Sequence, residues 1–194
     1  MLGNKTSRST SSDSGFSESA DTTKIRDNSK YKSPIGAVQS QCDGYGVYFL
    51  TDGVPNKATS STKNLMNESL LGGSSLINSC SSGSGWDCIF EYSKALYSKN
   101  NTKNTLVATA TVGFGKDFKE LDAQPKITKP FTRPSGAVEN VEVYDCENSN
   151  ITSQHAKNLC KLGEKGEGYG SGGFYYTETS HQIAKSIKKF IEDV

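Results

Sequence analysis

A short apolar run that stops at an acidic residue is the feature that most constrains the fold of this chain. Residues 47–50 (VYFL) are followed at once by Thr51, Asp52 and Gly53, and then by a proline at position 55. Such a pattern predicts a buried parallel strand that leads into a loop. An aspartate at the carboxyl end of such a strand lies where open α/β sheets bind their ligands. Asp52 is therefore the first candidate site residue.

The rest of the chain alternates between strand and helix patterns. Residues 106–114 (LVATATVGF) are nearly all apolar or β-branched, as expected of a central strand buried on both faces. Another strand is predicted at 174–177 (FYYT). Helices are predicted at 63–71, at 86–97, at 153–162 and from 180 to the carboxyl end. This order predicts an α/β fold with a parallel sheet covered by helices on both faces.

Two of the predicted helices carry an apolar face. The helix at 86–97 places four side chains on one face, namely Ile89, Tyr92, Ser93 and Leu96. The terminal helix begins with Thr179 and Gln182 at the spacing of a capping box. Its predicted buried stripe consists of Ile183, Ile187, Phe190 and Ile191.

Three segments lack the pattern of a regular element. Residues 1–31 hold few apolar side chains and are expected to be disordered, which leaves 32–194 as the folded domain. Residues 115–138 contain three prolines and are predicted to form an irregular insertion or long loop. The glycine-rich stretch 166–173 follows a helix and leads into a strand, whereas phosphate loops lead from a strand into a helix. It is therefore predicted to be a flexible connector.

Composition argues against several classes of function. The chain has 22 basic and 21 acidic residues and a net charge of +1, which gives no electrostatic reason to expect nucleic acid or a membrane surface as a partner. No apolar stretch is long enough to span a bilayer. The pattern places no nucleophile beside a base, so the chain is predicted not to be an enzyme.

Five cysteines indicate an oxidising compartment. Cys80 and Cys88 flank one short polar loop and Cys146 and Cys160 bracket another, so both pairs are candidates for disulfides. Cys42 is left over, and its partner is expected outside the chain. The alternative is five reduced thiols in a cytosolic protein. A structural zinc site is not expected, because there is no CxxC pair and there are only two histidines.

Several segments, in order, resemble a known family. Residues 33–35 (SPI), 49–56 (FLTDGVPN), 110–115 (ATVGFG) and 170–194 are similar to the later half of a von Willebrand factor A domain. The spacing of Cys146 and Cys160 around QHAKNLCKLGE narrows the resemblance to the A-type domain of the PilC/PilY family, large pilus-associated proteins of Gram-negative bacteria. The resemblance implies a Rossmann-like sheet whose first strands are not supplied by this chain.

The resemblance also implies a cation site. Domains of this type hold a divalent cation, Mg²⁺ or Ca²⁺, with hydroxyl, carboxylate and water ligands and one position open to an acidic group of the partner. Asp52 matches the aspartate of the family's TDG element, and Ser33 is carried over as its second-loop hydroxyl. The family's Asp-x-Ser-x-Ser loop has no counterpart, since Asp13-Ser14-Gly15-Phe16-Ser17 has glycine at one serine position. The expected site is therefore partial. Without a cation, Asp52 would be a loop residue accepting backbone hydrogen bonds.

The expected function follows from the resemblance. It implies a non-enzymatic part of an adhesin exported to the cell surface, outer membrane or pilus of a Gram-negative bacterium. Such a protein supports pilus assembly, host-cell adhesion and twitching motility. Its partners would be other pilus components or a host-cell receptor, together with the N-terminal part of the same domain. The alternatives are a truncated structural fragment that binds no metal, and a hydrolase that uses Asp52.

Overall fold

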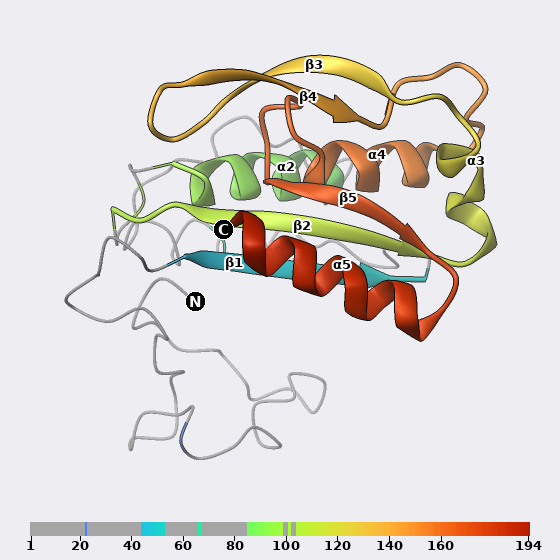
Figure 1. The fold of residues 1–194 in the computed structure, drawn as a ribbon, viewed down its shortest axis with the longest axis horizontal. Helices are drawn as coiled ribbons and strands as arrows, with labels where there is room; N and C mark the ends of the chain where they lie inside the picture. Colours follow the sequence, from blue (N-terminus) through green and yellow to red (C-terminus); the bar gives the residue numbers. More distant parts are fainter. Residues whose placement is uncertain (1–21, 23–43, 53–65, 67–84, 99–100, 102–103) are drawn as a thin grey trace.

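A three-stranded parallel sheet forms the centre of the molecule (Figure 1). The computed structural model describes residues 22, 44–52, 66, 85–98, 101 and 104–194. The strands are β1 (Tyr45–Thr51), β2 (Val107–Phe114) and β5 (Ser171–Thr177), and they lie in the order β1-β2-β5. The predicted α/β class, with a parallel sheet flanked by helices, is confirmed.

The central strand β2 is buried on both faces, as its apolar run predicts. Ala110, Thr111 and Val112 are each completely inaccessible to solvent. Successive side chains point to opposite faces of a sheet, so Ala110 and Thr111 belong to different layers. The Thr111 hydroxyl donates a buried hydrogen bond of 2.8 Å to the Leu159 carbonyl oxygen on the helix that covers its face. A polar residue is therefore compatible with this buried position because its hydrogen bond is satisfied.

Two helices cover one face of the sheet. Helix α2 (Gly85–Leu96) and helix α4 (Gln154–Gly163) lie on the same side (Figure 1). The main core cluster lies beneath them and includes Trp86, Phe90 and Phe174. On α2 the buried positions are Trp86, Phe90, Ser93 and Leu96. Ile89 and Tyr92, expected on the buried face, are only half-buried, because the contact stripe is rotated toward Trp86.

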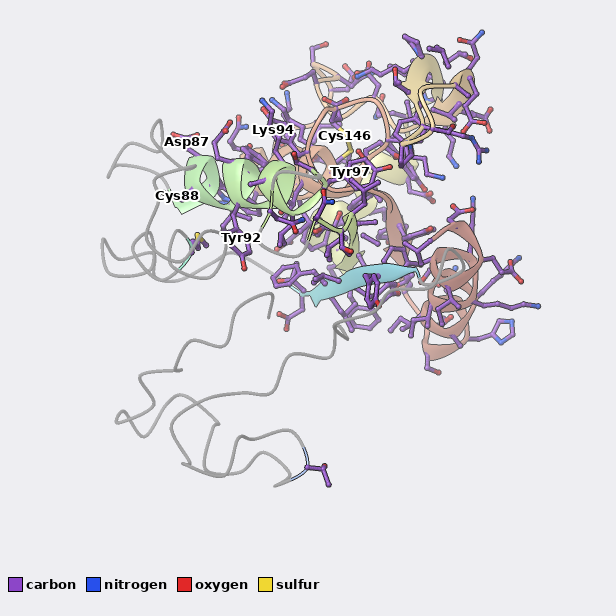
Figure 2. The ribbon with its side chains drawn as sticks, turned by 90° about the vertical axis from the view of Figure 1, so that its left-hand side faces the viewer. Asp87, Cys88, Tyr92, Lys94, Tyr97 and Cys146 are labelled. Atoms are coloured by element: carbon purple, nitrogen blue, oxygen red, sulfur yellow. A yellow bond between two sulfur atoms is a disulfide. The ribbon has the colours of Figure 1, made fainter. Side chains whose placement is uncertain are left out.

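Helix α5 (Ser180–Asp193) covers the opposite face, as both views show (Figures 1 and 2). Its capping box is present: Thr179 accepts from the Gln182 backbone N–H, and the Gln182 side chain accepts from the Thr179 backbone N–H. Phe190 packs on β2, and Ser186 is buried beside it. The predicted stripe is wrong at Ile187 and Ile191, which are 37% and 65% exposed. The helix contacts the sheet through Ser186 and Phe190, each one residue before these isoleucines.

Strand β1 is parallel as predicted but is not buried. Val47, Phe49 and Leu50 are 42%, 47% and 47% exposed. The expectation of a buried strand is therefore wrong for the described residues. Strand β1 is exposed because it is an edge strand: among the described residues it pairs only with β2.

The segment predicted to be irregular is largely regular. After β2 come a 3₁₀ turn (Lys116–Phe118), helix α3 (Lys119–Asp122), β3 (Ile127–Thr132) and β4 (Val138–Val143). Strands β3 and β4 form an antiparallel hairpin in which Pro130 lies opposite Asn140. Proline is excluded from central strands but tolerated at edges, and both strands of a two-stranded sheet are edges. The prolines were therefore a misleading signal for a loop.

The glycine-rich stretch is also more ordered than predicted. Strand β5 begins inside it, at Ser171. A Cβ on Gly172 would lie 2.6 Å from the backbone N of Ala110, so only glycine allows β5 to approach β2 this closely. Gly173 has φ of +97°, where the pairing of β5 with β2 shifts register. Residues 171–173 are part of the sheet rather than of a flexible connector.

Several predictions fall outside the described residues. Of the segment 1–31 only Thr22 is described, and of the helix predicted at 63–71 only Met66, which is helical. The boundary of the domain at residue 32 lies outside as well. None of the helices in the described part of the chain is long and apolar enough to cross a membrane.

A disulfide joins Cys146 to Cys160, with 5.5 Å between their Cα atoms. It links the loop after β4 to α4, and both cysteines are completely buried in the main core. Cys88 is disulfide-bonded as well. Cys42 and Cys80 lie outside the described residues, so the pairing of Cys80 with Cys88 stays a prediction.

We expect the double variant Cys146→Ser/Cys160→Ser to lose about 3 kcal/mol of unfolding free energy, because the cross-link restricts a loop of about 15 residues in the unfolded chain. Urea unfolding measures the loss. The matched control is Cys88→Ser, which removes a cysteine that is also disulfide-bonded. An unchanged midpoint and slope in the double variant would show that this bond does not stabilise the fold.

Candidate functional site

Asp52 lies at the carboxyl edge of the parallel sheet. It follows Thr51, which pairs with Gly113 of β2, and Gly113 pairs in turn with Tyr176 of β5. The carboxyl ends of all three strands therefore meet at one edge, which is the usual ligand-binding edge of such sheets. Asp52 is exposed there, so its carboxylate is accessible to a ligand.

Further acidic residues follow the other two strands. Asp117 comes three residues after the end of β2, and Glu178 comes directly after β5. Glu178 is already engaged, since its Oε1 accepts a 2.5 Å hydrogen bond from the Tyr176 hydroxyl and lies 4.0 Å from Lys119 Nζ. Burial of the Tyr176 hydroxyl and its hydrogen bond to Glu178 raise the pKa of Tyr176 to about 12. The Glu178 carboxylate thus has local partners of its own.

The donor set for a divalent cation is incomplete in this part of the structure. Among the described residues, no group of three or more His, Cys, Asp or Glu side chains could hold a metal ion. The Asp52 carboxylate is a hard oxygen group of the type that Mg²⁺ and Ca²⁺ prefer as a ligand. Ser33, the other predicted ligand, and Asp13 lie outside the described residues. Asp52 therefore lies at the edge of the sheet where the sequence predicts it.

Two cavities lie away from Asp52. The first, of about 860 Å³, is at the amino ends of the strands and is lined by Tyr45, Leu106 and Ser171 among others. The second, of about 850 Å³, runs along β5 and is lined by Phe174, Tyr176 and Lys185 among others. Neither cavity is lined by Asp52.

Sequence reasoning missed Glu164, which connects three elements beside the second cavity. Its side chain is buried, with 5% of the residue exposed. One carboxylate oxygen accepts from the Tyr144 backbone N–H at the end of β4 (3.1 Å), and the other accepts from the Lys165 N–H (2.9 Å). The only signal in the sequence was an acidic residue directly after a helix that ends in glycine, and this pattern is common on protein surfaces.

Burial raises the pKa of Glu164. Removal of the carboxyl from water raises its pKa, while the backbone N–H groups of Tyr144 and Lys165, the charge of Lys126 and the N–H of Phe174 act in the opposite direction. The cost of burying the charge is the larger effect. Glu164 therefore connects β4, the end of α4 and β5, although burial of its charged form is unfavourable.

A scan against protein-family models, a search of curated proteins and a search of solved structures each found no match for this chain.

The raised pKa of Glu164 gives a pH dependence of known sign. A carboxyl whose folded-state pKa lies above its ordinary value of about 4.3 contributes stability at low pH and loses that contribution as pH rises through the folded-state pKa. We expect wild type to lose unfolding free energy relative to Glu164→Gln as pH rises from about 4 toward neutrality. Urea unfolding of both proteins across this range measures the difference.

Glu120 provides a control of opposite sign. Backbone and side-chain hydrogen bonds from Thr152 lower the pKa of Glu120. Wild type should therefore lose stability relative to Glu120→Gln as pH falls below about 4.3. If the Glu164 difference had the same sign as the Glu120 difference, burial would not be the dominant influence on Glu164.

Proposed function

We propose that this chain is a non-enzymatic part of a type IV pilus-associated surface adhesin, of the von Willebrand factor A-like type found in the PilC/PilY family. In this proposal it is exported to the surface of a Gram-negative bacterium. The parent protein supports pilus assembly, host-cell attachment and twitching motility. The observation that carries the proposal is the position of Asp52, directly after a parallel strand and at the shared carboxyl edge of the sheet.

The topology is compatible with this assignment at a coarser level. The three strands are parallel, and β2 and β5 enter the sheet in chain order. Helices cover both faces, and each strand pair is connected through a helical segment or the β3–β4 insertion. These features are shared by many Rossmann-like folds, so they support the fold class, while the family rests on the sequence resemblance.

The exposed edge at β1 supports a further part of the proposal. Val47 and Phe49 are paired in register with Thr109 and Thr111, so they point to the face that α2 and α4 cover on β2. Both are more than 40% exposed. We propose that additional strands of the same A-type domain, supplied by another segment of the parent adhesin, pair with β1 and cover these side chains. An apolar strand edge otherwise favours association with other chains.

The cation site is proposed to be shared. Asp52 would supply one carboxylate oxygen, and Ser33 a hydroxyl oxygen. When bound, the cation would offer an open coordination position to an acidic group of a partner. We propose that other segments of the parent protein supply the remaining ligands.

A second candidate is a structural segment that binds no metal and acts only as part of a larger fold. The observation that favours it is the incomplete donor set around Asp52 within the described part of the chain. Cation titration separates the two candidates.

We expect Mg²⁺ or Ca²⁺ to raise the melting temperature of the wild-type chain, since a ligand that binds only the folded state stabilises it. At 100 times Kd the stabilisation is about 2.7 kcal/mol. Asp52→Ala is expected to abolish the increase. The matched control Glu142→Ala removes another exposed carboxylate, on β4, and is expected to keep it. A wild-type melting temperature independent of both cations would support the structural candidate.

The β1 edge has its own test. We expect Phe49→Lys to reduce self-association of the isolated chain in sedimentation velocity, because a charge on an exposed strand edge disfavours edge pairing. Val138→Lys adds the same charge to a side chain that is 66% exposed on the hairpin, and it is expected to have little effect. Equal effects of both substitutions would mean that net charge, rather than the β1 edge, controls association.

A further inference from the structure

We propose that the groove along the outer edge of β5 binds an extended acidic segment of a partner protein as an added β-strand. The groove is the cavity of about 850 Å³ bounded by β5, α5 and β4. It lies at the sheet edge opposite β1, and the proposal is independent of the cation site and of the adhesin assignment.

The backbone of β5 offers hydrogen-bonding groups to this groove. The Gly115 N–H donates to the Thr177 carbonyl oxygen (3.4 Å), so the polar groups of Thr177 face β2. Backbone groups of successive residues in a parallel strand point to alternate sides, which directs those of Phe174 and Tyr176 away from β2. The Phe174 N–H interacts with the Glu164 carboxylate, so the Phe174 carbonyl and both backbone groups of Tyr176 are the ones left for an added strand. Among the described residues no other strand pairs with this side of β5. Such an edge is a template for strand addition.

The opposite wall is a second strand edge. Val141 and Glu142 of β4 line the groove, and β4 belongs to a separate two-stranded sheet with β3. At one end the Glu164 carboxylate accepts from the Tyr144 N–H, and its pKa is also affected by the N–H of Phe174 on β5. The Glu164 carboxylate thus accepts hydrogen bonds between β4 and β5 at this end of the groove. Farther along the groove, backbone carbonyl oxygens of an inserted strand would do the same.

The charges in the groove favour an acidic segment. Two of its lysines are neutralised locally, since Lys165 pairs with Asp193 at 2.9 Å and Lys188 with Glu192 at 3.8 Å. Lys185 and Lys189 also line the groove and are exposed, and neither forms an ion pair with any described residue. Glu192 and Asp193 are the partners of those two paired lysines, while Glu142 on the opposite wall and Glu164 at one end are the acidic lining residues that a ligand would have to avoid.

The spacing of these two lysines matches that of a strand. Residues four apart on a helix rise by about 6 Å along its axis. Alternate residues of an extended strand are about 6.7 Å apart. Lys185 and Lys189 can therefore face two acidic side chains at alternate positions of one strand, with the intervening side chains on the other side.

An unsatisfied buried hydroxyl marks the end of the groove. Thr177 is 1% exposed and lines the cavity, and its Oγ1 has no hydrogen-bond partner. Buried polar groups usually have a partner. Thr177 shares the α5-facing side of β5 with Tyr175, so its hydroxyl is placed to bond a group that enters on that side.

The test uses a fluorescein-labelled eight-residue peptide of alternating Glu and Val, with fluorescence anisotropy as the readout. We expect saturable binding to the wild-type chain. Charge reversal at Lys185→Glu/Lys189→Glu is expected to weaken binding at least about tenfold, because two like-charge contacts replace two attractive ones. The matched control Lys94→Glu/Lys157→Glu changes the same charge on α2 and α4 and is expected to leave affinity within about twofold. Far-ultraviolet circular dichroism verifies that both double variants are folded.

Backbone pairing is tested with two N-methylated peptides, each modified at one alternate set of residues. If the peptide adds to β5, the two peptides are expected to differ, with the set facing β5 losing binding at least about tenfold. Equal binding of the two methylated peptides, or equal weakening by both lysine double variants, would overturn the proposal. No binding at 1 mM peptide, or displacement of the peptide by dimerisation of the chain through β5, would overturn it as well.

Discussion

The burial of β2 on both faces is the constraint on which the rest of the structure depends. Ala110 packs with Phe190 of α5, Val112 is completely buried, and the Thr111 hydroxyl bonds α4 through the Leu159 carbonyl oxygen. A strand with no accessible side must have a neighbouring strand on each edge and a helical layer on each face. This requirement fixes β1 and β5 beside it. It also brings the ends of all three strands to one edge.

The two outer strands have different chemistry. Strand β1 presents exposed apolar side chains at Val47 and Phe49, which suit a permanent apolar neighbour. Strand β5 instead borders a groove with lysines and a buried hydroxyl, which suits the reversible binding of a polar segment. We propose that β1 is the edge that joins the rest of the domain and that β5 is the edge that binds a partner segment. Asp52 directly follows β1, at the edge of the sheet where we propose that a cation binds.

Local patterns predicted the elements well where one physical requirement dominated. The run at 106–114 was recognisable as a central strand because both faces need apolar or β-branched side chains. The Thr179–Gln182 cap was recognisable because it satisfies helix amides within four residues. The hairpin was missed because Pro130 is compatible with an edge strand, and edges are defined by tertiary structure. The contacts of Glu164, between residues 20 apart, could not be inferred for the same reason. At the candidate site, sequence placed Asp52 at the carboxyl edge, but no local pattern could say which oxygens lie beside it.

The central claim is that Asp52 is a cation ligand at the carboxyl edge of the sheet. Its most direct test is the paramagnetic broadening of backbone amide NMR signals by added Mn²⁺. If Asp52 binds the ion, broadening is expected at the carboxyl ends of all three strands, at Gly113 and Thr177, and not at Tyr45 or Val107 at the amino ends. EDTA should reverse it. Broadening that is absent, or equal at both ends of the strands, would contradict a cation site at Asp52.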